Sequence, residues 1–375
     1  MQWLLSSMPF SRKSKVERQK TSCCFESIYR GLSSLSATVM LHIALATILI
    51  GACVTHFFGE QGEIHLRADQ AQTLNVKRST LSLFLWDFQV VYDSDNNPVD
   101  YITELRLLDR GESRVESGEL KVDEGVVRMN KPLIYKHFRF CQSNFDSDQL
   151  GVTLRYNYDP WGIGLTYTGY ALLLIAMIAF FFQRGTYFRA AWKKSVFRQR
   201  SGLYSVSAAV LIIALAIIMT KVVTPKPPLQ PVLQTPLLGI HVSVIMLAYT
   251  LFAIIAINGI IGLCNKRLST FNYQLSTILL YPAEFCLMAG IFIGAVWANM
   301  SWGRYWGWDP KETWALITML VYALLIHLPW LAGKLKMKND KLKMTYHICS
   351  IIAFFFVLFT YFGVKYFLGG LHSYA

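Results

Sequence analysis

The sequence lacks the motifs by which most enzymes are identified. It has no CxxC pair, no glycine-rich phosphate loop, no nucleophile or general-base triad and no internal repeat. The absence of CxxC excludes a thiol oxidoreductase of the thioredoxin type. Charged residues are also scarce, at 16% of the chain, whereas hydrophobic residues make up 54%. This composition excludes an ordinary soluble enzyme and indicates an integral membrane protein.

Acidic residues are in short supply as well, because 23 of them stand against 36 lysines and arginines, for a formal net charge of +13. The basic residues gather beside the apolar runs, which is the positive-inside pattern. We therefore expect a lipid membrane, and no nucleic acid, as the partner of this charge. The basic segments are residues 12–30, 184–200, 266–267 and 334–343. Their placement predicts a multi-pass protein of the cytoplasmic (inner) membrane, with the N-terminus cytoplasmic and the C-terminus extracytoplasmic.

Seven apolar runs have about the 20 residues that a membrane-spanning helix needs. They cover residues 37–57, 163–183, 204–223, 240–263, 275–298, 312–333 and 345–367. The first run has no clear small-residue cleavage site, so it is interpreted as a retained helix rather than a signal peptide. The predicted fold class is a mainly α-helical polytopic membrane protein, with about seven transmembrane helices and one small extracytoplasmic β-rich domain.

The long polar segment after the first run has the pattern of a β domain. Apolar residues alternate with other residues at Leu81, Leu83 and Leu85, and turn-forming clusters such as residues 93–98 interrupt the pattern. The predicted organisation is a basic cytoplasmic segment 1–36, a transmembrane helix 37–57, an extracytoplasmic β-rich domain 58–160, a transmembrane helix 163–183 and a membrane domain 204–375.

Residues 302–310 form the most informative segment of the chain. Trp302, Trp306 and Trp308 lie there with a tyrosine, two glycines and one acidic residue, between two apolar runs. Tryptophan and tyrosine are common at membrane interfaces, but a generic aromatic belt needs no glycine spacing and no terminal Asp-Pro. The segment is therefore interpreted as an aromatic platform for a large planar apolar ligand.

Four histidines lie at two levels of the expected membrane. His42 and His327 are on antiparallel spans, each about 8–9 Å inside the cytoplasmic boundary. His241 lies at the outer start of a span, and His372 follows the last span on the same side as the platform. Neutral imidazoles are axial ligands of porphyrin iron, so the outer pair, beside the aromatic platform, is a candidate ligand pair. The inner pair offers two imidazoles at matching depth, where unpartnered polar groups would be costly. The alternatives are separate backbone hydrogen bonds for the inner pair and unrelated interfacial histidines for the outer pair.

The other four histidines are weaker candidates. His56 lies at the outer end of the first span, and it becomes a candidate for the outer site if that span shifts in register. His347 fits a boundary residue at the inner start of the last span. His65 and His137 belong to the β-rich segment and are interpreted as structural or surface residues.

Residues 302–309 resemble, position for position, the WGxxWxWD signature of haem-handling proteins in cytochrome c maturation. The system II branch of these proteins (Ccs/Res type) is also similar over residues 204–375, notably at residues 241–243, 310–316 and 370–374. The N-terminal half is similar to the Res B-like partner subunit at residues 59–62, 85–88, 129–133 and 159–162. The chain thus resembles a compact fusion of the Res B-like and Ccs A-like subunits.

This resemblance implies a protein that transports haem b across the membrane and attaches it covalently to the CxxCH cysteines of apocytochrome c. Such an enzyme is a holocytochrome c synthase, or cytochrome c haem lyase, which forms thioethers. The resemblance implies His42 and His327 as inner ligands of the haem iron, and His241 and His372 as outer ligands. Two alternatives stay open: a haem transporter or chaperone without ligation activity, and an ion or proton transporter that uses buried histidines.

The platform residues receive roles from the same resemblance. Those expected to serve the attachment step are Trp302, Trp306, Trp308 and Asp309, with the acid orienting the loop. Gly303 would let the backbone approach the porphyrin, and Arg304 would pair with a haem propionate. Because the chain has no CxxC, a separate thiol-reducing protein is an expected partner.

Overall fold

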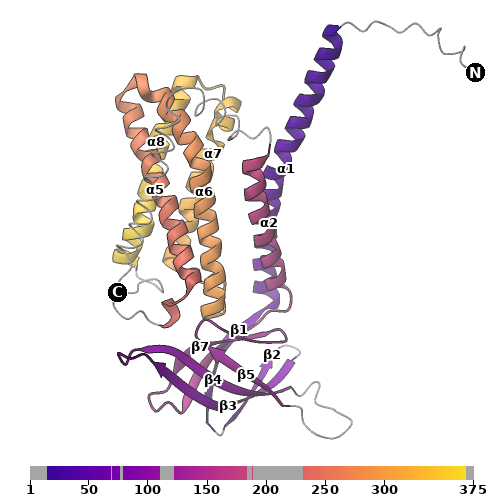
Figure 1. Ribbon diagram of the computed structural model, residues 1–375, viewed down its shortest axis with the longest axis vertical. Helices are drawn as coiled ribbons and strands as arrows, with labels where there is room; N and C mark the ends of the chain where they lie inside the picture. The colour runs from indigo at the N-terminus through magenta and orange to yellow at the C-terminus, as the bar shows by residue number, and fades with distance from the viewer. Residues whose placement is uncertain are drawn as a thin grey trace, which may run out of the picture.

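The computed structural model describes residues 15–68, 70–76, 79–109, 122–183, 188 and 231–368. Helices α1 (Lys15–Phe58) and α2 (Gly162–Phe182) form a pair that stands beside a bundle of further helices, with a β domain at one end (Figure 1). The pair packs closely because small residues, Ala44, Gly51 and Gly169, lie in its interface.

The bundle consists of α5 (Pro236–Cys264), α6 (Lys266–Trp302), α7 (Pro310–Lys334) and α8 (Asn339–Leu358), which continues as a π-helical segment, Phe359–Leu368. Within the described residues, six helices are long and apolar enough to cross a membrane. The polytopic helical fold class is therefore confirmed, while the expected span 204–223 lies outside the described residues. Helix α6 is longer than the apolar run 275–298 and takes in Trp302, the first residue of the aromatic segment.

The β domain contains two antiparallel sheets of four strands each, counted over the described part of the chain. The first sheet has the order β1 (Glu60–Arg67), β8 (Gly151–Tyr158), β7 (Phe138–Phe145) and β6 (Leu133–Tyr135). The second has the order β2 (Ala71–Val76), β3 (Ser79–Tyr92), β4 (Pro98–Asp109) and β5 (Val122–Arg128). Leu81, Leu83 and Leu85 are buried, as their alternation predicts, and belong to one core with Phe138 and Phe140.

Aromatic side chains join the helix pair to the bundle at two levels. Phe180 of α2 has its ring centroid 5.4 Å from those of Tyr281 and Phe285 in α6. Tyr170 of α2 lies 5.2 Å from Phe292, farther along α6. These contacts hold α2 against α6, and α1 lies against the same side of the bundle through its pairing with α2.

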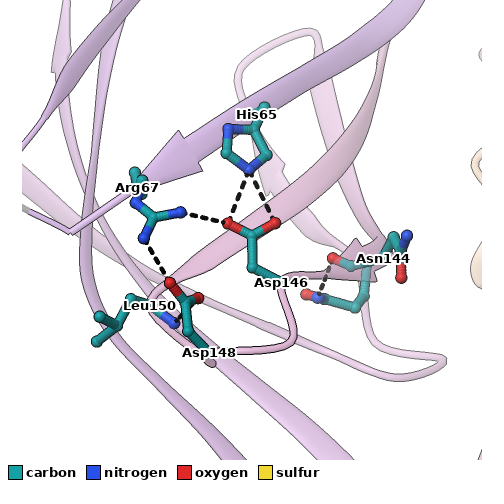
Figure 2. Close-up of polar contacts among 7 residues, drawn as sticks. His65, Arg67, Asn144, Asp146, Asp148 and Leu150 are labelled. Atoms are coloured by element: carbon teal, nitrogen blue, oxygen red, sulfur yellow. Dashed lines mark hydrogen bonds and ion pairs between the residues drawn. The ribbon is translucent and has the colours of Figure 1, made fainter.

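His65 lies in an ion-pair network on the surface of the β domain, as Figure 2 shows. Its Nε2 is 3.1 Å from a carboxylate oxygen of Asp146, and Arg67 donates to the same carboxylate at 3.0 Å. Arg67 also contacts Asp148 at 2.5 Å. The side chains are partly exposed, so each pair stabilises the domain by no more than about 1 kcal/mol. The contacts of His65 are those of a surface residue.

Candidate functional site

The structure brings His42 of α1 and His327 of α7 together. The centroids of the two imidazole rings are 6.4 Å apart, and the ring planes are inclined at 81°. Both side chains are exposed, so the rings meet at an accessible place rather than in a packed core. A bond between a metal and an imidazole nitrogen is about 2 Å long, which puts the ring centroids of two imidazoles on one metal roughly 6 Å apart. The observed spacing has this size.

Each of these two rings is oriented by its own helix. Nδ1 of His42 is 2.7 Å from the carbonyl oxygen of Thr38, and Nδ1 of His327 is 2.7 Å from that of Ala323. A carbonyl oxygen only accepts, so the proton lies on Nδ1 and Nε2 keeps its lone pair. Among the described residues, neither Nε2 has a hydrogen-bond partner. Backbone hydrogen bonds, the alternative interpretation of these histidines, are thus present, but they leave the metal-binding nitrogen of each ring available.

His241, near the start of α5, is oriented by a neighbouring helix instead. Its Nδ1 is 2.7 Å from the carbonyl oxygen of Gly290 in α6. The ring lies over Gly294, where an added Cβ would come within 2.6 Å of the imidazole. Only glycine leaves this space. Gly294 precedes Trp302 by eight residues, so the ring lies about 12 Å along α6 from the start of the aromatic loop, deeper in the bundle than the loop itself.

The loop of residues 303–309 is attached to the β domain at its first residue. Gly303 ends α6 with φ 73°, a left-handed conformation that glycine adopts without strain. Asn157 of β8 donates from Nδ2 to the Gly303 carbonyl oxygen at 2.8 Å, in a buried position. Sγ of Cys141 in β7 lies 3.2 Å from where a Cβ at Gly303 would be, and burial raises the pKa of this thiol to about 12. The close approach that Gly303 permits here is to the β domain.

The three tryptophans of the platform have different surroundings. The Trp302 ring lies 4.8 Å from that of Trp297 in α6. Trp306 packs against the core of the bundle, and its ring lies 6.1 Å from that of Trp308. Trp308 is 72% exposed and has φ 54°, which a bulky residue rarely adopts. An exposed aromatic ring on a strained backbone is typical of a ligand-binding loop.

One carboxylate holds the backbone on both sides of Trp308. Oε2 of Glu312 accepts from the backbone N–H groups of Gly307, at 2.8 Å, and of Asp309, at 3.3 Å. Asp309 in turn caps α7, because its side chain accepts from the N–H of Lys311 at 3.1 Å. Glu312 was not among the expected site residues. The spacing of an acidic N-cap residue and a glutamate three residues later, which is that of a capping box, is the signal that points to it.

Arg304 and Tyr305 have contacts within the loop and with the helix pair. The guanidinium carbon of Arg304 lies 3.2 Å from where a Cβ at Gly307 would be, so Gly307 makes room for Arg304. The Tyr305 ring lies 5.6 Å from Tyr167 and 6.1 Å from Tyr170 of α2. Burial raises the pKa of Tyr305. The N-terminal half of the chain therefore contacts the aromatic loop through α2 as well as through the β domain.

His56 does not approach the inner pair. It follows His42 by 14 residues, or about 21 Å along α1, and its ring lies 5.2 Å from that of Phe57. His42 is therefore the histidine of α1 that meets His327. The second expected outer ligand, His372, lies outside the described residues.

His347 is a packed core residue rather than a boundary residue. It is fully buried, and its Nε2 is 3.2 Å from the carbonyl oxygen of Ser269. An added Cβ at Gly262 of α5 would come within 2.5 Å of the ring. His347 thus fills the space between α5, α6 and α8.

Two protein families match the chain. The cytochrome C assembly protein family matches residues 165–372, which is more than half of the sequence. This chain belongs to the cytochrome c assembly protein family. The ResB-like family matches residues 12–184, so both parts of a ResB/CcsA fusion of system II are present, as the resemblance implied. His42 comes from the ResB-like part, whereas His241, His327 and the aromatic loop come from the cytochrome c assembly part.

Curated relatives include proteins named for cytochrome c biogenesis. Protein NrfI of Wolinella succinogenes is 37% identical over 191 residues, which is 47% of this chain and 20% of NrfI. Cytochrome c biogenesis protein CcsA of Chlamydomonas reinhardtii is 36% identical over 162 residues, or 40% of this chain and 43% of that protein. The CcsA protein of Prochlorococcus marinus is 32% identical over 188 residues, or 40% of this chain and 58% of that protein. The chain therefore spans less than two thirds of each relative. Membership of the family supports a role in cytochrome c maturation.

Proposed function

We propose that this protein receives haem b at the cytoplasmic side of the membrane, carries it to the outer side and attaches it to the CxxCH cysteines of apocytochrome c. Haem is the cargo and the substrate in this proposal. The observation that carries it is the pair His42 and His327, whose rings are 6.4 Å apart and whose Nε2 atoms are available, in a member of the cytochrome c assembly family.

The surroundings of the inner pair favour haem over a free metal ion as its ligand. Within the described residues, no group of three or more His, Cys, Asp or Glu side chains can hold a metal ion. Two imidazoles alone suit a metal that arrives with its other ligands, as iron does in a porphyrin. The pair spans the ResB-like and the cytochrome c assembly parts of the chain, so the inner ligand set needs both parts.

On the outer side, we assign axial ligation to His241 and His372 and cover of the porphyrin to Trp302, Trp306 and Trp308. In the attachment step each cysteine thiol adds across one vinyl group of the haem. A sulfur–carbon bond forms, and the thiol hydrogen ends on the other vinyl carbon, so no oxidant is consumed. The protein holds the vinyl groups beside the thiols and limits the access of water. The thiols must arrive reduced, so a separate thiol-reducing protein is required.

The proposed orientation puts the β domain and the aromatic loop outside and the N-terminus in the cytoplasm, in the inner membrane. Helix α6 ends at the β domain, where Asn157 holds Gly303, and it therefore begins at the opposite end of the bundle. Lys266 at the start of α6 and Lys334 at the end of α7 lie at that opposite end. Positive charge far from the β domain supports a cytoplasmic location for that end.

Co-expression with a CxxCH reporter, in cells without their own maturation system, tests the proposal. We expect covalent haem on the reporter, detected after denaturation, and none on a reporter whose two cysteines are alanines. A reporter free of covalent haem, together with haem that co-purifies with the protein, would reject ligation and leave a transporter or chaperone. A purified protein without a Soret band would reject haem binding altogether and favour an ion or proton transporter.

A further inference from the structure

Strand β7 places a basic residue beside the aromatic loop. Phe138 and Phe140 belong to the core of the β domain, so Arg139 between them points to the opposite face of the sheet. Arg139 is opposite Asn157 in the register of β7 and β8, and Asn157 donates to the carbonyl oxygen of Gly303. Cross-strand partners share a face of the sheet. Arg139 therefore lies on the face that holds the loop.

The guanidinium of Arg139 is buried, and no acidic residue in the described part of the chain forms an ion pair with it. The residue is only 8% exposed, and its Nε and Nη1 have no hydrogen-bond partner among the described residues. Three other arginines of the β domain have acidic partners. Arg67 pairs with Asp146 and Asp148, Arg106 with Glu124, and Arg155 with Glu63. A guanidinium cannot be deprotonated in a protein, and burying it without a partner is strongly unfavourable. A position of this kind is suited to an anionic ligand.

The charge of Arg139 acts on the loop as well as on the sheet. It lowers the pKa of Tyr305 and of Cys141 against the larger raising effect of burial, so the guanidinium lies near both groups. Tyr305 belongs to the aromatic loop, and Cys141 contacts the glycine at which that loop begins. The unpaired charge is thus at the junction of the β domain and the aromatic loop.

We propose that Arg139 binds a carboxylate of the porphyrin cargo, that is, a haem propionate, when haem occupies the outer site. This inference rests on the proposed function and adds a ligand-binding residue from the ResB-like part to it. A planar guanidinium matches a carboxylate with two parallel hydrogen bonds, and it binds more strongly where water is excluded. Arg304, the propionate partner expected from the sequence, is only partly buried, against Gly307. Arg139 is the better shielded of the two cations.

The test compares haem with its dimethyl ester, in which both carboxylates are blocked. Both ligands are titrated into the purified full-length protein, on a His327→Ala background that removes the inner pair. The variants are Arg139→Gln and, as a matched control, Arg155→Gln, whose guanidinium already has Glu63 as its partner. We expect wild-type Arg139 to favour haem over the ester by about ten- to a hundredfold, the effect of a hydrogen bond to a charged group. Arg139→Gln should remove most of this preference, whereas Arg155→Gln should keep it.

The melting temperature without haem separates ligand binding from a structural role. Because Arg139 has no ion-pair partner among the described residues, Arg139→Gln should melt no lower than the parent protein in the absence of haem. A variant that keeps the preference for haem, or that melts well below its parent without haem, overturns the inference. If the parent binds haem and the ester equally, the inference is also overturned while the proposed function stands. If neither the His327→Ala protein nor the wild-type protein binds haem or its ester, the proposed function itself is rejected.

Discussion

At the inner site, the carbonyl oxygens that orient His42 and His327 belong to the same helices as the rings. At the outer site, His241 is oriented by a carbonyl of another helix, and the aromatic loop by a side chain of the β domain. The orientation of the inner rings therefore comes from local helix structure, and only their contact with each other requires tertiary packing. At the outer site, the contacts that orient His241 and fix the start of the loop cross between elements, whereas Glu312 supports the end of the loop locally.

The two sites also differ in exposure, and this difference fits their proposed tasks. The inner rings are exposed, which allows a ligand to enter and leave between the helix pair and the bundle. The outer imidazole lies against Gly290 and Gly294, with little freedom to move. A site that passes a ligand on benefits from access, whereas a site of covalent attachment benefits from fixed geometry. Substitutions at one site should therefore leave haem binding at the other site detectable.

The largest effect is expected from His327→Ala. The substitution removes one of two ligands of the inner pair, so haem affinity there should fall by more than about 100-fold, beyond the loss typical of a residue that only supports a ligand. Added imidazole should restore the visible spectrum of bound low-spin haem. His56→Ala, at the far end of α1, is the control and should keep the spectrum. An unchanged spectrum in His327→Ala would contradict the inner ligand assignment.

Gly294→Ala should damage the outer site and spare the inner one. The new Cβ would come within 2.6 Å of the His241 ring and must displace it, at a cost of about 1–3 kcal/mol for overpacking. Covalent haem on a reporter should decrease, while haem bound at the inner pair remains. Gly239→Ala is the matched control on α5, since nothing lies within 4 Å of its added Cβ. An equal loss of covalent haem in both variants would show that haem attachment does not depend on the position of the His241 ring.

Asn157→Ala should weaken the attachment of the loop to the β domain. It leaves the buried carbonyl oxygen of Gly303 without its donor, which costs about 1–3 kcal/mol. We expect a lower melting temperature and less covalent haem on the reporter, with the inner spectrum retained. Asn75→Ala, at an exposed position of β2, serves as the control. Loss of the inner spectrum in Asn157→Ala would mean that the two sites are coupled through the β domain.

Alkylation of Cys141 should report on the same junction. Its pKa is raised to about 12 by burial, so the folded protein keeps the thiol protonated at pH 8 and should react slowly with a maleimide. The raised pKa of Cys141 makes its contribution to the free energy of unfolding pH-dependent. This contribution is full below the ordinary thiol pKa near 9 and is lost as the pH rises towards 12. Mass spectrometry at pH 8 should find faster modification in Asn157→Ala. Equal rates of Cys141 modification in the wild-type protein, in Asn157→Ala and in the denatured chain would contradict the burial of Cys141 at this junction.

The smallest effect is expected from His65→Ala. The contact of His65 with Asp146 is partly exposed, so the free energy of unfolding should change by less than about 1 kcal/mol. Neither the inner spectrum nor the covalent haem on the reporter should change. A loss of haem from either site would assign this surface network a functional role that its geometry does not suggest.

Much of the architecture was readable from local patterns along the chain. Hydropathy runs marked the helices, and the alternation of Leu81, Leu83 and Leu85 marked the β domain. The matching depth of His42 and His327 followed from the rise of a helix per residue. Helix ends were less accurate: Trp302 belongs to α6, because Gly303 is the residue that ends the helix. The role of Asp309 as a helix cap was also within reach of the sequence, through its spacing from Glu312.

Contacts between distant segments needed the folded chain. Asn157 and Gly303 are far apart in the sequence, and no local pattern relates a strand residue to a helix end in another domain. The same holds for His241 above Gly294 and for the unpaired charge of Arg139 beside the loop. Periodicity reports which face of an element is buried, but not which element covers it. The choice of partner depends on packing across the whole molecule, and here that packing brings the two family parts into contact at His42 and His327 and at Asn157 and Gly303.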